Sequence, residues 1–255
     1  MKISFLGTGT STGVPVISCT CEVCTSADPR DQRLRSSLLL ENADDKIIID
    51  CGPDFRQQMI SINMDFPTGI IITHGHRDHI AGLDDIRGFN FIHRKPVEIF
   101  IPQHSLHAIQ TEFPYIFNPG NYKRAPSANI HTLKGENFTV GSTTFTPLPC
   151  LHNLEEVWGY KTGNFAYITD ASSISEETID LLSGIDYLVL NALRIKPHPS
   201  HFSLEQAIDL VLRVIKPGKV WFTHISHFMG LHADASEFLP EGISLAYDGL
   251  SVELS

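Results

Sequence analysis

Basic residues and long apolar runs are both scarce in this sequence of 255 residues. Lys and Arg number 19 against 29 Asp and Glu, which gives a formal net charge of −10. An acidic chain with no run of Lys and Arg is a poor nonspecific binder of nucleic acid. No apolar run reaches the ~18 residues that a membrane-spanning helix needs, and the first residues lack the apolar core of a signal peptide. We therefore expect a cytoplasmic protein that does not enter membranes and for which nucleic acid is a disfavoured partner.

Cysteine is also sparse, with five residues in the chain. An odd count without a signal sequence argues against a framework of disulfides. Three of the five lie close together at Cys19, Cys21 and Cys24, and a tight cluster in a reducing compartment more often holds a metal ion. Cys51 and Cys150 stand alone, and we expect them in the core.

The apolar fraction of 42% is typical of a globular protein, and the length favours one domain over residues 1–255. The spacing of apolar residues from Ser203 to Ile215 predicts an amphipathic helix. The segment 113–130 is irregular and is interpreted either as a surface loop or as a lid over a site. Further helices are expected at 53–60 and 175–182, and strands at 2–6, 36–41, 46–50, 69–73, 97–101, 137–140, 143–148, 157–161, 165–169, 187–190, 219–223 and 249–254.

The densest set of chemically active side chains follows the apolar strand predicted at 69–73. It consists of His74, His76, Asp78 and His79. Two histidines two positions apart on an extended chain point to the same side. Four such groups in six residues are not a set of core side chains, because each buried imidazole needs a polar partner. Imidazole together with carboxylate is a ligand set for Zn, Mn or Fe at a hydrolytic centre.

This His-x-His-x-Asp-His string resembles the metallo-β-lactamase superfamily. The resemblance implies an α/β fold of the αββα four-layer sandwich type, with two divalent metals at one edge of the sheets. Three more ligands are implied, each just past a predicted strand: His152, Asp170 and His224. One metal would then bind His74, His76 and His152, the other would bind Asp78, His79 and His224, and Asp170 would bridge them.

A narrower resemblance is to the PhnP group of phosphoribosyl 1,2-cyclic phosphate phosphodiesterases. It is carried by Leu6–Thr10 with Val14-Pro15, by the cysteine cluster, by Thr223–His227 and by Tyr247–Gly249. It implies a structural zinc bound by Cys19, Cys21, Cys24 and His227, a closed tetrahedral set. The alternative is that these cysteines are buried as small apolar residues. It also implies that His201, rather than its neighbour His198, meets the phosphate and protonates the leaving oxygen.

The implied activity is hydrolysis of a small, cyclic phosphodiester by a hydroxide that bridges the two metals. Asp78 and His201 are the implied catalytic residues. The implied assembly is a homodimer. The alternatives left open are a tRNA 3′-processing endonuclease, a thioester or lactam hydrolase, and a non-enzymatic metal-binding protein. Residues 84–130 depart from the PhnP pattern, so the substrate is the least determined feature. Five histidines are expected to be structural: His93, His104, His107, His131 and His232.

Overall fold

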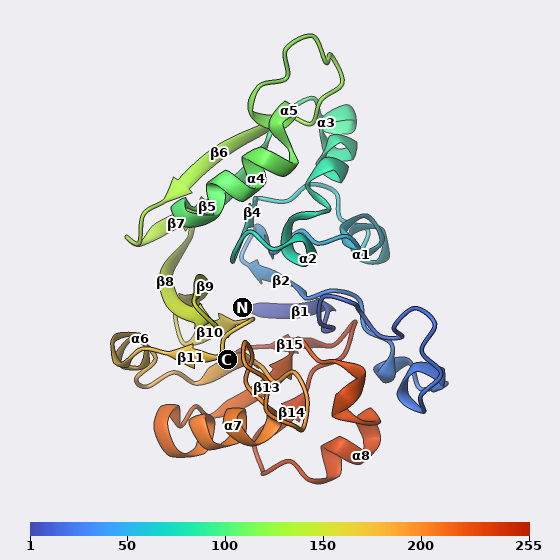
Figure 1. Ribbon diagram of the computed structural model, residues 1–255. Coiled ribbons are helices and arrows are strands. Elements are labelled where there is room, and N and C mark those ends of the chain that lie inside the picture. Colours follow the sequence, from blue (N-terminus) through green and yellow to red (C-terminus); the bar gives the residue numbers. More distant parts are fainter.

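Two mixed β-sheets face each other in the computed structural model, which describes residues 1–255 (Figure 1). The first sheet has the strand order β15-β1-β2-β3-β4-β5-β6. Its strands are β1 (Lys2–Gly7), β2 (Ser37–Asn42), β3 (Asp45–Ile49), β4 (Gly69–Ile71), β5 (Val97–Pro102), β6 (Ala128–Leu133) and β15 (Ser251–Glu253). β1 to β3 pair antiparallel, and β3 to β6 pair parallel.

The second sheet has the order β11-β8-β9-β10-β12-β13-β14, with β7 paired to β8. β8 to β10 are antiparallel, and β10, β12, β13 and β14 are parallel. Its strands are β7 (Phe138–Val140), β8 (Thr143–His152), β9 (Glu155–Thr162), β10 (Phe165–Ile168), β11 (Ser173–Ile174), β12 (Tyr187–Asn191), β13 (Lys219–Thr223) and β14 (Ile243–Leu245).

Three apolar clusters account for the layers. The central cluster joins residues of both sheets, such as Phe5 and Ile49 from the first and Tyr167 and Trp221 from the second. The outer face of the first sheet packs against α1 (Phe55–Ser61), α2 (Arg77–Ile80), α3 (Arg87–His93), α4 (Leu106–Glu112) and α5 (Pro114–Phe117). The outer face of the second packs against α6 (Glu176–Leu181), α7 (Leu204–Asp209) and α8 (His232–Glu237). The order of layers is αββα, as the resemblance to the metallo-β-lactamase superfamily implied.

Most predicted strands are confirmed with shifts of one to four residues at their ends. The predicted helix 203–215 begins at its Ser203 cap, which forms a capping box with Gln206, but its second half is a π-helix, Leu210–Ile215. The elements that were not predicted are α2, α3, α4, α5, α8, β6, β11 and β14. The loop 118–127 extends from α5 at the top of Figure 1, at the far end of the first sheet. No helix has both the length and the apolar character required to cross a membrane.

Three strands end in the same unusual way. Asp50 after β3, Asp170 after β10 and His224 after β13 have positive φ angles of 67°, 57° and 56°. Left-handed backbone is uncommon for residues other than glycine, and such strain is found where a site fixes the chain. These three residues lie where the two sheets come together at one edge of the sandwich. The backbone thus marks a candidate functional site before any side chain is considered.

Candidate metal centre

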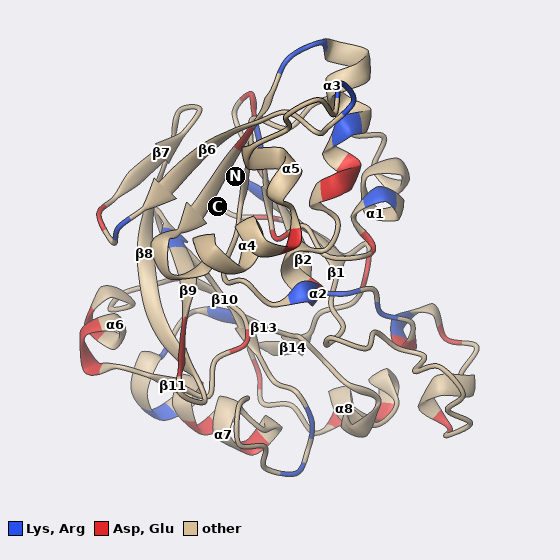
Figure 2. Cartoon of the chain, turned by 45° about the horizontal axis from the view of Figure 1, so that its top comes forward, with Lys and Arg blue, Asp and Glu red and all other residues tan.

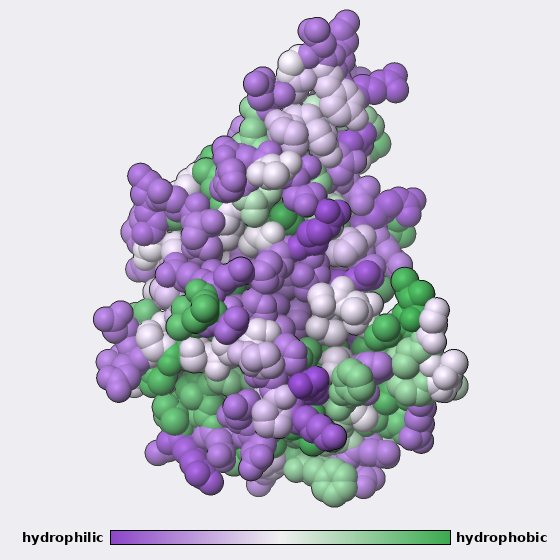
Figure 3. Space-filling view, viewed as in Figure 1, coloured by the Kyte–Doolittle hydropathy of each residue, from purple (hydrophilic) through white to green (hydrophobic).

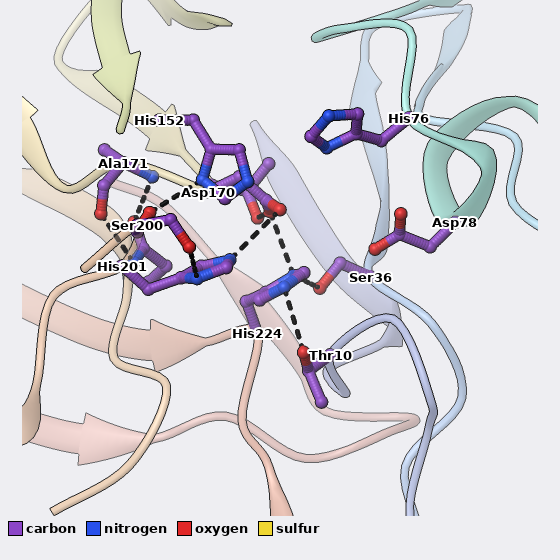
Figure 4. A network of polar contacts seen from close by, with 12 residues as sticks. Thr10, Ser36, His76, Asp78, His152, Asp170, Ala171, Ser200, His201 and His224 are labelled. Carbon is purple, nitrogen blue, oxygen red and sulfur yellow. Dashed lines mark hydrogen bonds and ion pairs between the residues drawn. The ribbon is translucent and has the colours of Figure 1, made fainter. Parts of the chain in front are cut away.

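Asp170 lies at the centre of the buried polar groups at this edge (Figure 4). Its Oδ1 is 2.9 Å from Nδ1 of His224 and 3.3 Å from Nε2 of His79. Its Oδ2 is 3.9 Å from Nε2 of His74 and 3.4 Å from Nε2 of His201. Burial opposes ionisation of Asp170, but His224 and His79 outweigh it and hold its pKa well below the usual range. One ionised carboxylate therefore faces both halves of the predicted ligand set.

Two of the predicted ligands have a buried nitrogen without a hydrogen-bond partner. These atoms are Nε2 of His74 and Nε2 of His79. Their other nitrogens are engaged: Nδ1 of His74 lies 3.0 Å from Oγ1 of Thr73, and Nδ1 of His79 lies 2.7 Å from Oδ2 of Asp50. Since Nδ1 donates to these oxygens, Nε2 is in each case the ring nitrogen left to bind a metal at the centre of the site.

The charges around His79 also favour a cation. Burial works against protonation of this imidazole, but Asp170, Asp78 and Asp50 outweigh it and raise the pKa of His79 well above its usual value. Oδ2 of Asp78 is 3.2 Å from Nε2 of His79. The cluster of Asp78, His79, Asp170 and His224 thus attracts a positive charge at the point its ligand atoms face, and divalent metals fit this donor set.

The other half of the site is arranged less tightly. His74, His76 and Asp170 form one group of converging ligand atoms, and His152 forms another with Asp170 and His201. Nε2 of His76 contacts Oε2 of Glu155 at 2.9 Å, and Nδ1 of His152 donates to the carbonyl of Ser200 at 2.6 Å. These contacts leave Nδ1 of His76 and Nε2 of His152 as the free ligand atoms. In Figure 4, His76 and Asp78 point from one side of the site toward Asp170 on the other.

His201 lies inside the site, as predicted, with its ring centroid 4.5 Å from that of His152 and 4.9 Å from that of His224. Burial lowers the pKa of His201 to about 4, more than its contact with Asp170 raises it. The neutral imidazole therefore predominates at pH 7. Oγ of Ser200 lies 3.1 Å from Nδ1 of His201. His198 lies on the outer side of His201, and the Nδ1 atoms of the two rings are 3.4 Å apart.

The sequence analysis missed Asp50. Its oxygens accept hydrogen bonds from the amide and hydroxyl of Thr73 and from Nδ1 of His79. Through Thr73 it also orients His74, so one buried carboxylate fixes the tautomers of two predicted ligands. The available signal was its position directly after a strand of β-branched residues, the same setting as that of Asp170.

The predicted structural zinc ligands also converge. Sγ of Cys19, Cys21 and Cys24 each lies 3.4 Å from Nδ1 of His227. Tetrahedral zinc with Zn–S near 2.3 Å and Zn–N near 2.0 Å separates sulfur from nitrogen by about 3.5 Å. A backbone hydrogen bond from Cys24 lowers the pKa of Cys21 to about 6, whereas burial raises the pKa of Cys24 to about 11, so Cys21 is the thiol of the two that ionises first in the absence of metal. The chain therefore fits zinc at this second position.

Next to the ligand loop lies a polar cleft of about 390 Å³. It is lined by residues of three segments: His74, Gly75 and His76; His104, Ser105 and Ala108; and Glu155 and Glu156. His104 was predicted to be structural, but it faces this cleft with Nδ1 3.3 Å from Oε1 of Glu156. Figure 3 shows that hydrophilic residues gather across the middle of the face that the site opens onto.

Comparison with known proteins agrees with this arrangement. Residues 45–225 match the model of the beta-lactamase superfamily domain. An octanoyltransferase of Porphyromonas gingivalis is 40% identical over 253 residues, which is 98% of this chain but 51% of that protein. The chain thus spans about half the length of that relative.

Two solved structures show the same fold over the whole chain. A diphosphatase from the PhnP family superimposes with a TM-score of 0.91 and 36% identity, covering 100% of this chain and 98% of that one. Zn²⁺-bound PqqB from Methylobacterium extorquens superimposes with a TM-score of 0.80 and 19% identity, covering 100% of both chains. The chain described here belongs to the beta-lactamase superfamily, has the metallo-β-lactamase fold and resembles the PhnP family over its whole length.

Proposed function

We propose that this protein is a metal-dependent hydrolase of small phosphodiesters, with cyclic phosphodiesters as the preferred class. The observation that carries the proposal is the convergence of both halves of the ligand set on Asp170, with His201 beside them. The likeness to a PhnP-family diphosphatase over the full chain supports phosphorus as the atom attacked. His74, His76, His152, Asp78, His79, His224 and Asp170 would hold two divalent metals, which could be Zn, Mn or Fe.

When bound, the metals would supply Lewis-acid stabilisation of the phosphoryl oxygens and a nucleophile from water at neutral pH. The side chains around them have separate tasks. Asp170 supplies negative charge to both halves, and Asp50 fixes His74 and His79 in the tautomers that ligation needs. His201 is close enough to Asp170 to reach a phosphate there, and in its protonated form Nε2–H would donate to the leaving oxygen; the negative charge of a bound phosphate would have to offset the burial that lowers the pKa of His201.

A small substrate is supported by the charges of the chain. Lys and Arg lie at separate places around the molecule in Figure 2, so they offer no long track for an anionic polymer. The net charge of −10 opposes such a polymer as well. These features favour a small diester over precursor tRNA.

Two other activities have specific support. The PhnP-family relative is described as a diphosphatase, which favours a diphosphate ester. The Porphyromonas gingivalis relative is described as an octanoyltransferase, which favours acyl or thioester chemistry. About half of that relative lies outside the match, and its described activity belongs to the whole protein. We therefore place thioester hydrolysis behind both phosphorus substrates.

A panel of substrates tests the proposal on protein loaded separately with Zn, Mn and Fe. It contains a ribosyl 1,2-cyclic phosphate, a 2′,3′-cyclic nucleotide, bis-p-nitrophenyl phosphate, a dinucleoside diphosphate, a precursor tRNA and an octanoyl thioester. We expect the highest kcat/KM on a cyclic phosphate. Turnover of the diphosphate alone would replace the cyclic class, and turnover of only the thioester or the tRNA would contradict the proposal. A homodimer is also proposed, and light scattering of the same preparation tests it.

A further inference from the structure

The N-terminal motif Leu6–Thr10 ends beside a predicted metal ligand (Figure 4). Oγ1 of Thr10 lies 3.2 Å from Nε2 of His224, and both side chains are buried. The Thr10 hydroxyl has no other hydrogen-bond partner in the protein. The two residues are 214 positions apart, so the fold and not the local chain brings this hydroxyl to the ligand.

The other nitrogen of His224 faces oxygen lone pairs. Oγ of Ser36 donates to the carbonyl of Gly9 at 3.0 Å and lies 3.2 Å from Nδ1 of His224. Because the Ser36 hydroxyl has one proton and Gly9 receives it, Ser36 turns a lone pair toward Nδ1. Oδ1 of Asp170 faces the same nitrogen at 2.9 Å. The space beside Nδ1 therefore favours a positive centre, whereas Nε2 is left to Thr10.

The distances between the ligand atoms agree with this assignment. Nδ1 of His224 is 2.9 Å from Oδ1 of Asp170, and Nε2 of His79 is 3.3 Å from the same oxygen. Oδ2 of Asp78 is 3.2 Å from Nε2 of His79. Nitrogen and oxygen atoms bound to one ion at about 2.0–2.2 Å lie about 3 Å apart. Nδ1 of His224 thus has the spacing of a ligand atom that shares an ion with these neighbours.

The backbone on both sides of this contact is held in place. The carbonyl of Thr8 accepts from the amide of Ile225 at 2.8 Å, and the amide of Thr10 donates to the carbonyl of Ile225 at 3.2 Å. Oδ1 of Asp248 accepts from the amide and the hydroxyl of Thr8 at 2.9 and 2.7 Å. Ile225 directly follows His224, so the motifs that contain Thr8 and Asp248 support the same ligand.

We propose that Thr10 is a positioning residue for His224: its hydroxyl accepts a hydrogen bond from Nε2–H and leaves Nδ1 as the nitrogen that binds the metal. His74 and His79 are held the opposite way, since their Nδ1 atoms are engaged and Nε2 faces the centre. The hydrogen bond at one ring nitrogen decides which nitrogen a metal takes. The inference rests on the metal site of the proposed function and not on its substrate.

Two variants of Thr10 test this role by zinc affinity, measured by competition with a chelator. Thr10→Val keeps the branched shape and removes the hydroxyl, and loss of such a partner typically weakens metal binding by about 10- to 100-fold. The loss should affect one of the two positions at the metal centre, because the contacts of His74 and His76 are unchanged. Thr10→Ser keeps the hydroxyl and should bind zinc as the wild type does.

Thr143→Val is the matched control. Thr143 is a buried threonine whose hydroxyl donates to Oδ2 of Asp45 at 2.9 Å and touches no predicted ligand. This variant should lower the melting temperature and keep both zinc affinities. An unchanged zinc affinity in Thr10→Val, an equal loss at both positions, or an equal loss in Thr10→Ser would overturn the proposal.

A measurement on the unaltered chain does not depend on how the variants fold. Long-range ¹H–¹⁵N correlation spectra of the zinc-loaded protein show which nitrogen of each imidazole carries the proton. We expect the proton of His224 on Nε2 and the protons of His74 and His79 on Nδ1. A proton on Nδ1 of His224 would reject the inference even if phosphodiesters are hydrolysed. The expected pattern would support it even if no phosphodiester is cleaved and the proposed function fails.

Discussion

Oδ2 of Asp50 lies 2.7 Å from Nδ1 of His79, and both side chains are completely buried. The same carboxylate accepts from the hydroxyl of Thr73, which lies 3.0 Å from Nδ1 of His74. His74 and His79 belong to different halves of the predicted metal site. A single carboxylate behind the ligands therefore couples the orientation of both halves.

Asp50→Asn should weaken metal binding in both halves of the site together. The amide keeps the shape of the side chain, but its NH₂ group faces donors from Thr73 and His79. Loss of such an outer partner typically lowers metal affinity or activity by about 10- to 100-fold. Metal affinity is measured by competition with a chelator, and activity by kcat/KM on bis-p-nitrophenyl phosphate.

Asp45→Asn is the matched control for Asp50. Asp45 lies at the start of the same strand, β3, and its carboxylate accepts from Ser142 and Thr143, far from the metal ligands. This variant should lower the melting temperature and keep the wild-type metal affinity. If Asp50→Asn behaves like it, Asp50 supports the fold and does not tune the site.

Asp170→Ala should deplete metal from both halves of the centre. Its two oxygens face His79 and His224 on one side and His74 on the other, so its loss removes shared charge. Elemental analysis of the purified variant should show clear depletion, with the structural zinc retained. Two-metal occupancy with wild-type turnover would exclude Asp170 as the bridging ligand.

Cys21→Ser should release one zinc ion per chain and lower the melting temperature. The set joins the N-terminal loop to the segment after β13 across roughly 200 residues, and ligand bonds in such a clip stabilise the folded state. The catalytic ligands should remain in place. Cys150→Ala is the control: it removes a buried thiol from the core and should cost stability but no zinc. An unchanged zinc content and melting point in Cys21→Ser would refute the Cys₃His site.

The cluster from His74 to His79 could be picked out from the residues themselves, whereas His152, Asp170 and His224 were implied by the resemblance to the superfamily. Their places at or just past strand ends agree with that resemblance, because strand ends meet at one edge of a layered sheet.

The role of Asp50 could not be predicted, although Asp50 also follows a strand. Its role depends on the parallel register of β3 and β4, which pairs Ile49 with Ile71 and so brings Asp50 next to Thr73. A lone aspartate after a strand has no local mark of such a partner.

The helices over residues 87–117 were not predicted, for a different reason. α3 and α4 have seven residues each and α5 has four, which is too short for a clear helical period. Helices of this length are stabilised by packing against the sheet and not by their own propensity. His104 and Ser105 precede α4, so their place beside the ligand loop could not be predicted either.

His201 combines two features that make its role open to measurement. Its Nε2 lies 3.4 Å from Oδ2 of Asp170, so it reaches the centre of the site. It also groups with His152 and Asp170 as a potential ligand, although the resemblance assigns it to proton donation. Rate and metal content together distinguish the two roles.

His201→Ala should slow hydrolysis of alkyl phosphodiesters by about 10²–10⁴-fold, the usual contribution of a general acid. The loss should be smaller for p-nitrophenyl esters, because p-nitrophenolate is a stable anion that needs little protonation on departure. Both metals should remain bound in the variant. His198→Ala provides the comparison: His198 contacts His201 from the outer side, and its loss should change the rate far less. Full activity of His201→Ala on alkyl diesters would exclude the proton-donor role. A rate loss that only follows a fall in metal content would make His201 a ligand, because a proton donor can be removed without emptying the site.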